Sequence, residues 1–196
     1  GFNAGSAVAA DGSAGMAMLV THISASVGAL TWMAIEWIKS GKATMIGIAT
    51  GMVAGLATIT PASGTVGPAG ALLIGFMAGL VCFYATQAVK SYFKIDDSLD
   101  VFPVHGVGGI LGIIMLAIVG NPDGFLGSGA SGISEDGVVA QLVIQLQGVF
   151  IICAYTALIT YVILKVLNMF IEVRVTNEQE DIGLDMSEHN EQGYSL

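Results

Sequence analysis

Charged residues are scarce in this sequence, and little in it suggests a metal or disulfide framework. Aspartate, glutamate, lysine and arginine make up 11% of the 196 residues, whereas an ordinary soluble domain contains roughly 25%. The two cysteines, Cys82 and Cys153, lie in separate apolar runs without metal-ligand spacing, so we expect both to be structural. No basic segment opens the chain, so a signal peptide is not predicted.

Apolar residues and glycine dominate instead. Hydrophobic residues account for 54% of the chain, the mean hydropathy is +0.79, and there are 27 glycines. Small residues are common where transmembrane helices touch one another. The composition therefore predicts an all-α membrane protein, a multi-span helical bundle in a lipid bilayer. Much of the net charge of −9 lies in six acids near the C-terminus, and no nucleic-acid partner is expected.

Five apolar runs are candidates for membrane spans, because about 17 to 25 helical residues cross the hydrocarbon core. The fifth run is longer than a bilayer requires, which predicts a tilted or protruding helix. Residues 1–10 resemble the end of a further helix, and a Gly/Ser loop is predicted at 120–132. We predict a membrane domain over residues 1–172 and an acidic tail over 173–196. The five runs cover residues 14–38, 43–59, 69–93, 101–119 and 138–171.

The basic residues predict the orientation of the spans. They flank the first and third connections and the end of the fifth run, and the second and fourth connections contain none. Because successive spans alternate sides, all six basic residues fall on one side, which the positive-inside rule makes cytoplasmic. We therefore expect a multi-pass protein of the cell membrane with a cytoplasmic C-terminus. The six are Lys39, Lys42, Lys90, Lys94, Lys165 and Arg174.

Glycines spaced four apart mark three of the runs. Residues with this spacing share one face of a helix, so each run presents a smooth face that a neighbouring backbone can approach closely. We expect tight helix packing there and no phosphate-binding loop. The glycines are Gly47, Gly51 and Gly55, then Gly75 and Gly79, then Gly108 and Gly112.

Acids near the ends of the spans have local interpretations. Glu36 and Trp37 are expected at the inner membrane face, where a snorkelling charge and an interfacial aromatic need no further role. Asp97, followed three residues later by Asp100, resembles a helix N-cap with an acid in the first turn.

The three histidines are the candidates for chemistry. His105 lies in an uncharged apolar run, where it is either a functional group or a hydrogen-bonded group between helices. His22 lies beside Thr21 and Ser24, which could hydrogen-bond it, and a structural role is expected. His189 lies in the acidic tail and is expected in water. Because no spacing predicts a metal site or a hydrolytic triad, neither an enzyme nor a cofactor is expected, and a pore is favoured.

Several segments of the chain resemble the ammonium transporter family (Amt/Mep/Rh). The longest is Asp96-Asp-Ser-Leu-Asp-Val-Phe-Pro-Val-His-Gly-Val-Gly-Gly-Ile-Leu-Gly112. The others are Gly1-Phe-Asn-Ala-Gly-Ser-Ala7, Thr58-Ile-Thr-Pro-Ala-Ser-Gly64 and Gly183-Leu-Asp185. Their order and spacing match the family along the whole chain. The resemblance implies the second half of an inverted-repeat, eleven-helix ammonium transporter fold, assembled as a homotrimer.

The resemblance also implies roles for individual residues in transporting ammonium or ammonia through a narrow hydrophobic pore. His105 matches the second of two histidines that line this pore. Phe2 matches one of two stacked phenylalanines at the outer mouth, and Ser6 matches a serine that helps to recruit ammonium. Thr60 and Val101 match pore-lining positions. The first histidine and the other phenylalanine would lie outside this chain, and no residue here replaces them.

The acidic tail has two interpretations. It is either a solvated end of the chain or, as the resemblance implies, a docking site for a PII-type signalling protein, with Gly183, Asp185 and Tyr194 as the docking positions. The second interpretation leaves open an ammonium sensor that signals through its tail with little flux. A further alternative is a half-protein that is inert until it is joined to its other half.

Overall fold

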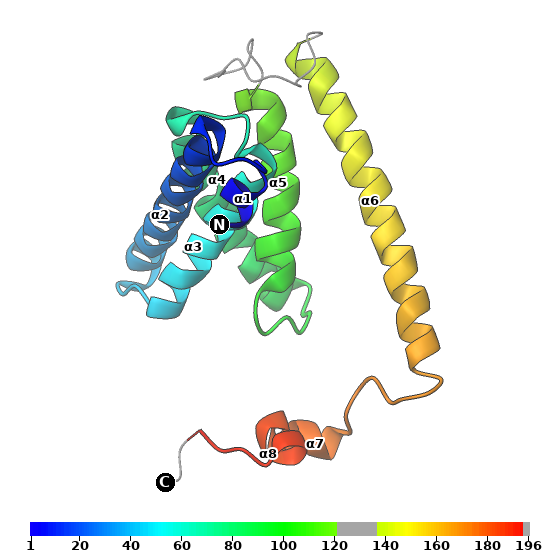
Figure 1. The fold of residues 1–196 in the computed structure, drawn as a ribbon. Helices are drawn as coiled ribbons and strands as arrows, with labels where there is room; N and C mark the ends of the chain where they lie inside the picture. Colours follow the sequence, from blue (N-terminus) through cyan, green and yellow to red (C-terminus); the bar gives the residue numbers. More distant parts are fainter. Residues whose placement is uncertain (121–136, 194–196) are drawn as a thin grey trace. The chain divides into compact units, whose positions relative to one another are not determined.

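A computed structural model describes residues 1–120 and 137–193, and every regular element within these ranges is helical (Figure 1). Contacts within the chain group into two units, residues 1–149 and 150–196, which we describe separately. The loop predicted at 120–132 lies, apart from Gly120, outside the described residues.

The first unit begins with a short helix, α1, and contains four of the five apolar spans. The 3-10 segment η1 follows α3, and the π-helical segments η2, η3 and η4 extend α4 and flank α5. The fifth span, α6, crosses the boundary between the units. The elements are α1 (Phe2–Gly5), α2 (Gly12–Ser40), α3 (Met45–Ile59), η1 (Thr60–Ala62), α4 (Pro68–Gln87), η2 (Ala88–Tyr92), η3 (Phe102–Val107), α5 (Gly108–Met115), η4 (Leu116–Gly120) and α6 (Val138–Leu167).

Five helical stretches among the described residues are long and apolar enough to cross a membrane, which confirms the predicted number of spans. Their bounds lie close to the predicted runs, although the fifth ends at Leu167 rather than near Ile171. The stretches are Gly12–Ser40, Met45–Ala62, Pro68–Tyr92, Phe102–Gly120 and Val138–Leu167.

Local chemistry explains where α2 and α3 begin and end. The Asp11 carboxylate accepts hydrogen bonds from the backbone N–H groups of Ser13 and Ala14 at 2.9 and 3.1 Å, which caps α2. Gly41 ends α2 in the left-handed conformation, at φ +73°. The Thr44 hydroxyl then caps α3 by accepting from the N–H of Gly47 at 2.9 Å.

The predicted glycine faces allow direct backbone contact between α2, α3 and α4. A Cβ added to Gly28 would lie 2.5 Å from the carbonyl oxygen of Gly51, and one added to Gly75 would lie 2.6 Å from that of Ser24. The buried Ser24 hydroxyl donates to the carbonyl oxygen of Gly55 at 2.9 Å. Small residues and an interhelical hydrogen bond therefore hold these spans together, as expected for helices in lipid.

Two hydrophobic clusters fill the space between the spans of the first unit. Val20, Ile59, Ile74 and Val119 belong to the first. Trp32, Phe83, Cys82 and Val104 belong to the second, in which the Trp32 and Phe83 rings meet edge to face at 5.2 Å. Cys82 is buried, in agreement with its predicted structural role, whereas Cys153 is exposed on α6.

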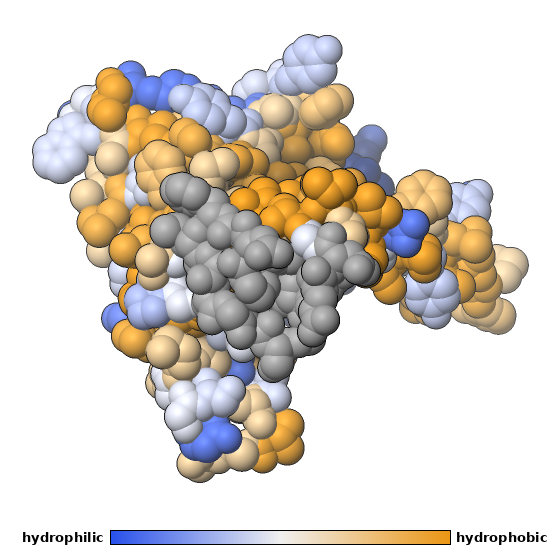
Figure 2. All heavy atoms as spheres, turned by 90° about the horizontal axis from the view of Figure 1, so that it is seen from above, coloured by the Kyte–Doolittle hydropathy of each residue, from blue (hydrophilic) through white to orange (hydrophobic). Residues whose placement is uncertain are grey.

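Apolar side chains also cover much of the outer surface, outside the grey residues of Figure 2. Leu30, Leu72 and Phe76 are about half exposed on α2 and α4. A soluble protein rarely exposes so many large apolar residues together. This surface is consistent with helices that face lipid.

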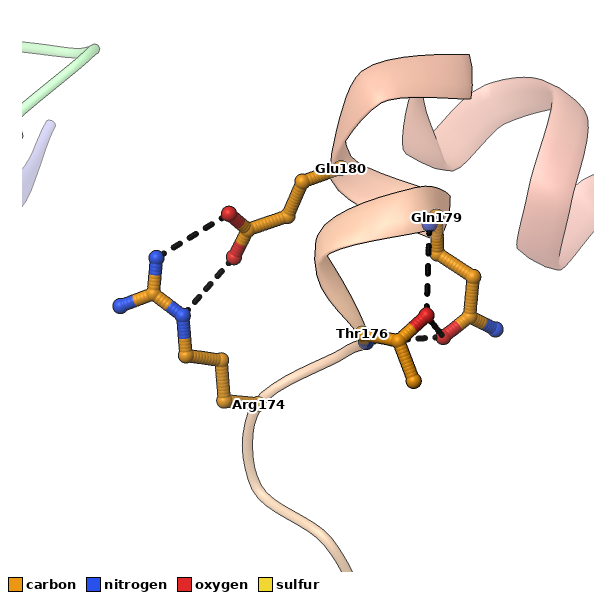
Figure 3. Close-up of polar contacts among 4 residues, drawn as sticks. All are labelled: Arg174, Thr176, Gln179 and Glu180. Atoms are coloured by element: carbon orange, nitrogen blue, oxygen red, sulfur yellow. Dashed lines mark hydrogen bonds and ion pairs between the residues drawn. The ribbon is translucent and has the colours of Figure 1, made fainter.

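The second unit contains the end of α6 and two short helices, α7 (Asn177–Ile182) and α8 (Leu184–His189). Thr176 and Gln179 form a reciprocal capping box at the start of α7, and Arg174 pairs with both carboxylate oxygens of Glu180 at 2.8 and 3.1 Å (Figure 3). The predicted boundary at 172/173 falls between α6 and α7 and stays a prediction.

Candidate functional site

A cavity of about 380 Å³ in the first unit brings three predicted site residues together. Phe2 comes from α1, Thr60 from η1 and His105 from η3, and all three line this cavity. The Phe2 side chain is 80% exposed and the His105 side chain is also exposed. The remaining lining residues are Gly1, Asn3, Thr21, Val53, Leu56 and Ala57, so the wall is mostly apolar.

The Asn3 side chain fixes α1 to the rest of this wall. Its Nδ2 donates hydrogen bonds to the hydroxyl oxygens of Thr21 at 3.0 Å and Thr60 at 3.4 Å. The Thr60 hydroxyl in turn donates to the carbonyl oxygen of Leu56 at 2.7 Å. This network places Phe2, the neighbour of Asn3, beside the cavity. Asn3 was not among the predicted site residues, because its partners Thr21 and Thr60 lie far from it in the sequence.

Asp97 hydrogen-bonds to the start of η3, although the N-cap position is Val101 and not Asp97 as predicted. The Asp97 carboxylate accepts hydrogen bonds from the N–H groups of Val101 at 2.9 Å and Phe102 at 2.8 Å. The predicted role of Asp100 as a first-turn acid is wrong, because Asp100 precedes the helix at φ +56° and forms an ion pair with Lys90 at 2.8 Å.

The fourth span is packed closely against α3 and α4 at two of its glycines. A Cβ added to Gly108 would lie 3.0 Å from the Thr58 hydroxyl and 3.3 Å from the Cys82 sulfur, and one added to Gly112 would collide with the Thr58 carbonyl oxygen. His105 lies in the preceding segment η3, where its side chain is exposed and lines the cavity. The segment that carries His105 is π-helical, a geometry often found at functional sites.

Two other predicted site residues lie outside the lining of this cavity. The Ser6 hydroxyl donates to the carbonyl oxygen of Phe2 at 2.9 Å, just beyond α1. Val101, which is 52% exposed, precedes η3 and donates its N–H to Asp97. Their assigned roles therefore stay predictions.

Comparison with known proteins agrees with this arrangement. The model of the Ammonium Transporter Family matches residues 1–194. The chain belongs to the ammonium transporter family. This confirms the resemblance found in the sequence, and relatives in this family are named as transporters rather than as enzymes.

Curated relatives of this ammonium transporter family chain include proteins from bacteria and archaea. The ammonium transporter of Aquifex aeolicus is 42% identical over 196 residues, which are 100% of this chain and 45% of the relative. Ammonium transporter Amt1 of Archaeoglobus fulgidus is also 42% identical, over 100% of this chain and 48% of the relative. The chain therefore spans about half the length of the curated relatives it matches.

Solved structures in the family share the fold. A structure titled "Sensor Amt Protein" matches with a TM-score of 0.83 and 27% identity over 95% of this chain and 45% of that one. Mep2 of Saccharomyces cerevisiae matches with a TM-score of 0.75 and 35% identity, over 86% and 40% of the two chains. The coverage is consistent with the predicted half of an inverted-repeat fold.

The other histidine in a span of this ammonium transporter family chain, His22, lines a neighbouring cavity of about 340 Å³ with Met18 and Met52. The hydroxyls of Thr21 and Ser24, which we expected to hydrogen-bond to His22, have other partners. Thr21 accepts a hydrogen bond from Asn3, and Ser24 donates one to the carbonyl oxygen of Gly55. His22 is exposed on the described unit rather than enclosed between its helices. The sequence could not show this, because it does not reveal which partner a hydroxyl chooses.

Two of the predicted docking positions lie in the small helices of the tail. Gly183 connects α7 to α8 at φ +94°, a conformation that favours glycine, and Asp185 lies in the first turn of α8. Tyr194 lies outside the described residues. The hydrogen bond from Gln179 Nε2 to the Glu188 carboxylate, at 2.7 Å, links the two helices.

Proposed function

We propose that this chain forms part of a membrane transporter that recruits ammonium and lets ammonia pass a histidine in a narrow apolar pore. The observation that carries the proposal is the convergence of Phe2, Thr60 and His105 on one mostly apolar cavity. These residues come from three separate elements, and the resemblance to the family had assigned all three to the pore or its outer mouth. Their convergence supports a common path.

The chemistry of the cavity suits ammonia better than a bare ion. An apolar wall strongly penalises an unpaired charge, whereas a neutral molecule with N–H donors crosses at much lower cost. An aromatic face such as that of Phe2 attracts a cation by about 0.5–2 kcal/mol, and the Ser6 hydroxyl replaces part of its water shell. Ammonium recruited there loses its proton, which is either carried through separately or returned to the outer side, and ammonia moves on past Thr60 and Val101.

His105 is the proposed relay. Within the described part of the chain no hydrogen bond to its ring is present, so both ring nitrogens are available to the cavity. A neutral imidazole both donates and accepts a hydrogen bond, and it changes charge near neutral pH. We propose that a second histidine and the other gating phenylalanine come from the part of the family fold that this chain does not span.

The assembly and orientation follow the same reasoning. We propose a homotrimer in the cell membrane, with the tail in the cytoplasm because the basic residues flank that side. We further propose that the tail docks a PII-type regulator through Gly183, Asp185 and Tyr194. The two short helices α7 and α8 support this, because Gly183 lies between them and Asp185 lies in the first turn of α8.

Methylammonium uptake into vesicles tests the transport proposal. The full-length protein that contains this sequence is reconstituted with and without the substitution His105→Ala. We expect uptake to disappear in this variant and to persist in the matched control His189→Ala, which changes a tail histidine. Uptake that survives His105→Ala would refute the relay.

The alternative function is an ammonium sensor. It is favoured by the likeness to the structure titled "Sensor Amt Protein", which covers 95% of this chain. In a sensor, a partner bound to the tail responds to ammonium although the vesicle uptake is negligible. The same preparation distinguishes the two functions when partner binding is measured beside flux.

A further inference from the structure

The segment η3, which carries His105, begins only after Asp100, and Pro103 explains why. Proline has no backbone N–H and clashes with the carbonyl group four residues before it, so a helix tolerates it only in the first turn. A helix that began directly after Asp97 would place Pro103 in its interior. In the structure η3 begins at Phe102, so Pro103 lies in its first turn and Asp100 stays outside the helix.

The backbone of Asp100 therefore has an unusual conformation. Its φ of +56° lies in the left-handed region, which aspartate tolerates better than most residues but which persists only where surrounding contacts enforce it. Its N–H donates to the carbonyl oxygen of Asp97 at 3.2 Å, and its own carbonyl oxygen accepts from the N–H of Val104 at 3.0 Å. Because Val104 directly precedes His105, the main chain connects Asp100 to the histidine.

The side chain of Asp100 is held by a different element. It forms an ion pair at 2.8 Å with Lys90 of η2, and it is 16% exposed, whereas the lysine side chain is 43% exposed. The Asp100 Oδ1 atom is itself buried and accepts no hydrogen bond of good geometry from the described residues. The Lys90 ammonium group is therefore the charge that compensates this atom.

The difference in exposure decides what happens when the pair is broken. A buried carboxylate without its cation is strongly unfavourable, so we expect the Asp100 side chain to turn toward water and to move the backbone that begins η3. A lysine without its carboxylate reaches water through its exposed side chain at little cost. Loss of the Lys90 charge should therefore disturb the segment of His105 more than loss of the Asp100 charge.

We propose that Lys90 and Asp100 are positioning residues for His105. Their ion pair ties the start of η3 to η2 and so keeps the histidine at its cavity. Neither residue lines that cavity, so both act through the segment rather than on the substrate. The assignment rests on the proposed transport function, in which His105 is the relay.

Three variants of the full-length protein test the pair. Lys90→Gln removes the cation and leaves the carboxylate unpaired, whereas Lys90→Arg keeps the cation. The double variant Lys90→Gln/Asp100→Asn removes both charges and keeps a side chain that tolerates the left-handed backbone. Lys42→Gln is the matched control, because it removes an exposed lysine from the connection between α2 and α3. The variants are compared in vesicles that contain equal amounts of folded protein.

We expect Lys90→Gln to lower the maximal rate of methylammonium uptake about three- to tenfold, as for an ion pair that is partly exposed. The KM should stay the same, since Phe2 and Ser6, the proposed recruiting residues, lie in another part of the chain. Amide hydrogen exchange should accelerate by a similar factor in residues 101–107 and stay unchanged in α3. Lys90→Arg and the double variant should restore the rate, because neither leaves a buried charge unpaired, and Lys42→Gln should keep it.

The other outcomes overturn the proposal. A double variant as slow as Lys90→Gln shows that the two charges do not act as a pair. Faster exchange throughout the first unit, or a Lys90→Gln protein that does not fold, shows that the pair supports the whole fold. Unchanged exchange in residues 101–107 shows that it does not hold the segment. An unsubstituted protein without flux refutes the transport function instead, and the exchange alone then decides whether the pair holds the segment.

Discussion

The Asp97 carboxylate offers a direct test of how the fold positions His105. It accepts from two backbone N–H groups, those of Val101 and Phe102, at 2.9 and 2.8 Å. Both groups belong to the free N-terminal end of η3 and have no helical partner of their own. The substitution Asp97→Ala leaves them without their acceptor and removes a negative charge from the start of the helix. We expect the segment up to Val107 to open more often.

The size of the effect follows from the type of contact. Replacing a capping Asp by Ala costs about 0.5–2 kcal/mol in proteins. Asp97 is partly buried, and two N–H groups depend on it, so we expect about 1–2 kcal/mol of local destabilisation. A loss of this size raises the population of the open state by roughly 5- to 30-fold. Amide hydrogen exchange in the segment should accelerate by the same factor if it occurs through this local opening.

Hydrogen exchange measured by mass spectrometry on the full-length protein checks the prediction, with peptides that cover residues 97–107. Asp96→Ala is the matched control, because the exposed Asp96 carboxylate accepts only from the Ser98 hydroxyl, at 3.2 Å. Methylammonium uptake should also fall in Asp97→Ala, since His105 lies in the loosened segment. Exchange within about twofold of the control would refute the idea that this cap holds the histidine in place.

Two further predictions concern packing and the tail. Gly112→Ala places a Cβ against the Thr58 carbonyl oxygen and should destabilise the protein by about 1–3 kcal/mol, as overpacking does. Nothing lies within 4 Å of a Cβ added to Gly109, so Gly109→Ala should be tolerated and is the control. Thermal unfolding in detergent compares the two variants, and equal stability would contradict the contact at Gly112. Thr176→Ala removes the capping box of α7 and should destabilise that helix by about 0.5–2 kcal/mol, so that amide exchange in residues 177–182 becomes faster. Asn177→Ala is the control. Equal amide exchange in the two variants would argue against a stabilising cap.

The sequence was sufficient for the spans because hydrophobic length is a property of the chain itself. The five runs and the glycine faces needed only local spacing, and the structure confirms them. The role of Asp100 was wrong because the sequence does not show that Lys90, ten residues earlier, competes for its carboxylate. The helices of the tail were not predicted, because its acidic composition indicated a solvated segment and the capping box at Thr176 was not considered.

The candidate site was less accessible to sequence reasoning, since its walls come from residues far apart in the chain. His105 could be singled out because an ionisable group in an apolar run is costly, whatever surrounds it. Asn3 could not, because its importance depends on hydroxyls 18 and 57 residues away, on Thr21 and Thr60. An ionisable residue in an apolar run can be recognised from the sequence, whereas a residue that connects two elements can be recognised only when the positions of these elements are known.

Glu36 shows that one residue can belong to both groups. From the sequence its charge had a sufficient explanation at the membrane surface, so no further role was expected. In the structure the same carboxylate is partly buried and accepts hydrogen bonds from three neutral donor groups, the indole N–H of Trp32 and the N–H and hydroxyl of Thr44. A negative charge near the N-terminus of a helix is stabilising, and Thr44 is the N-cap of α3. The Glu36 side chain therefore joins the end of α2 to the start of α3, a role that depends on how the two helices are placed.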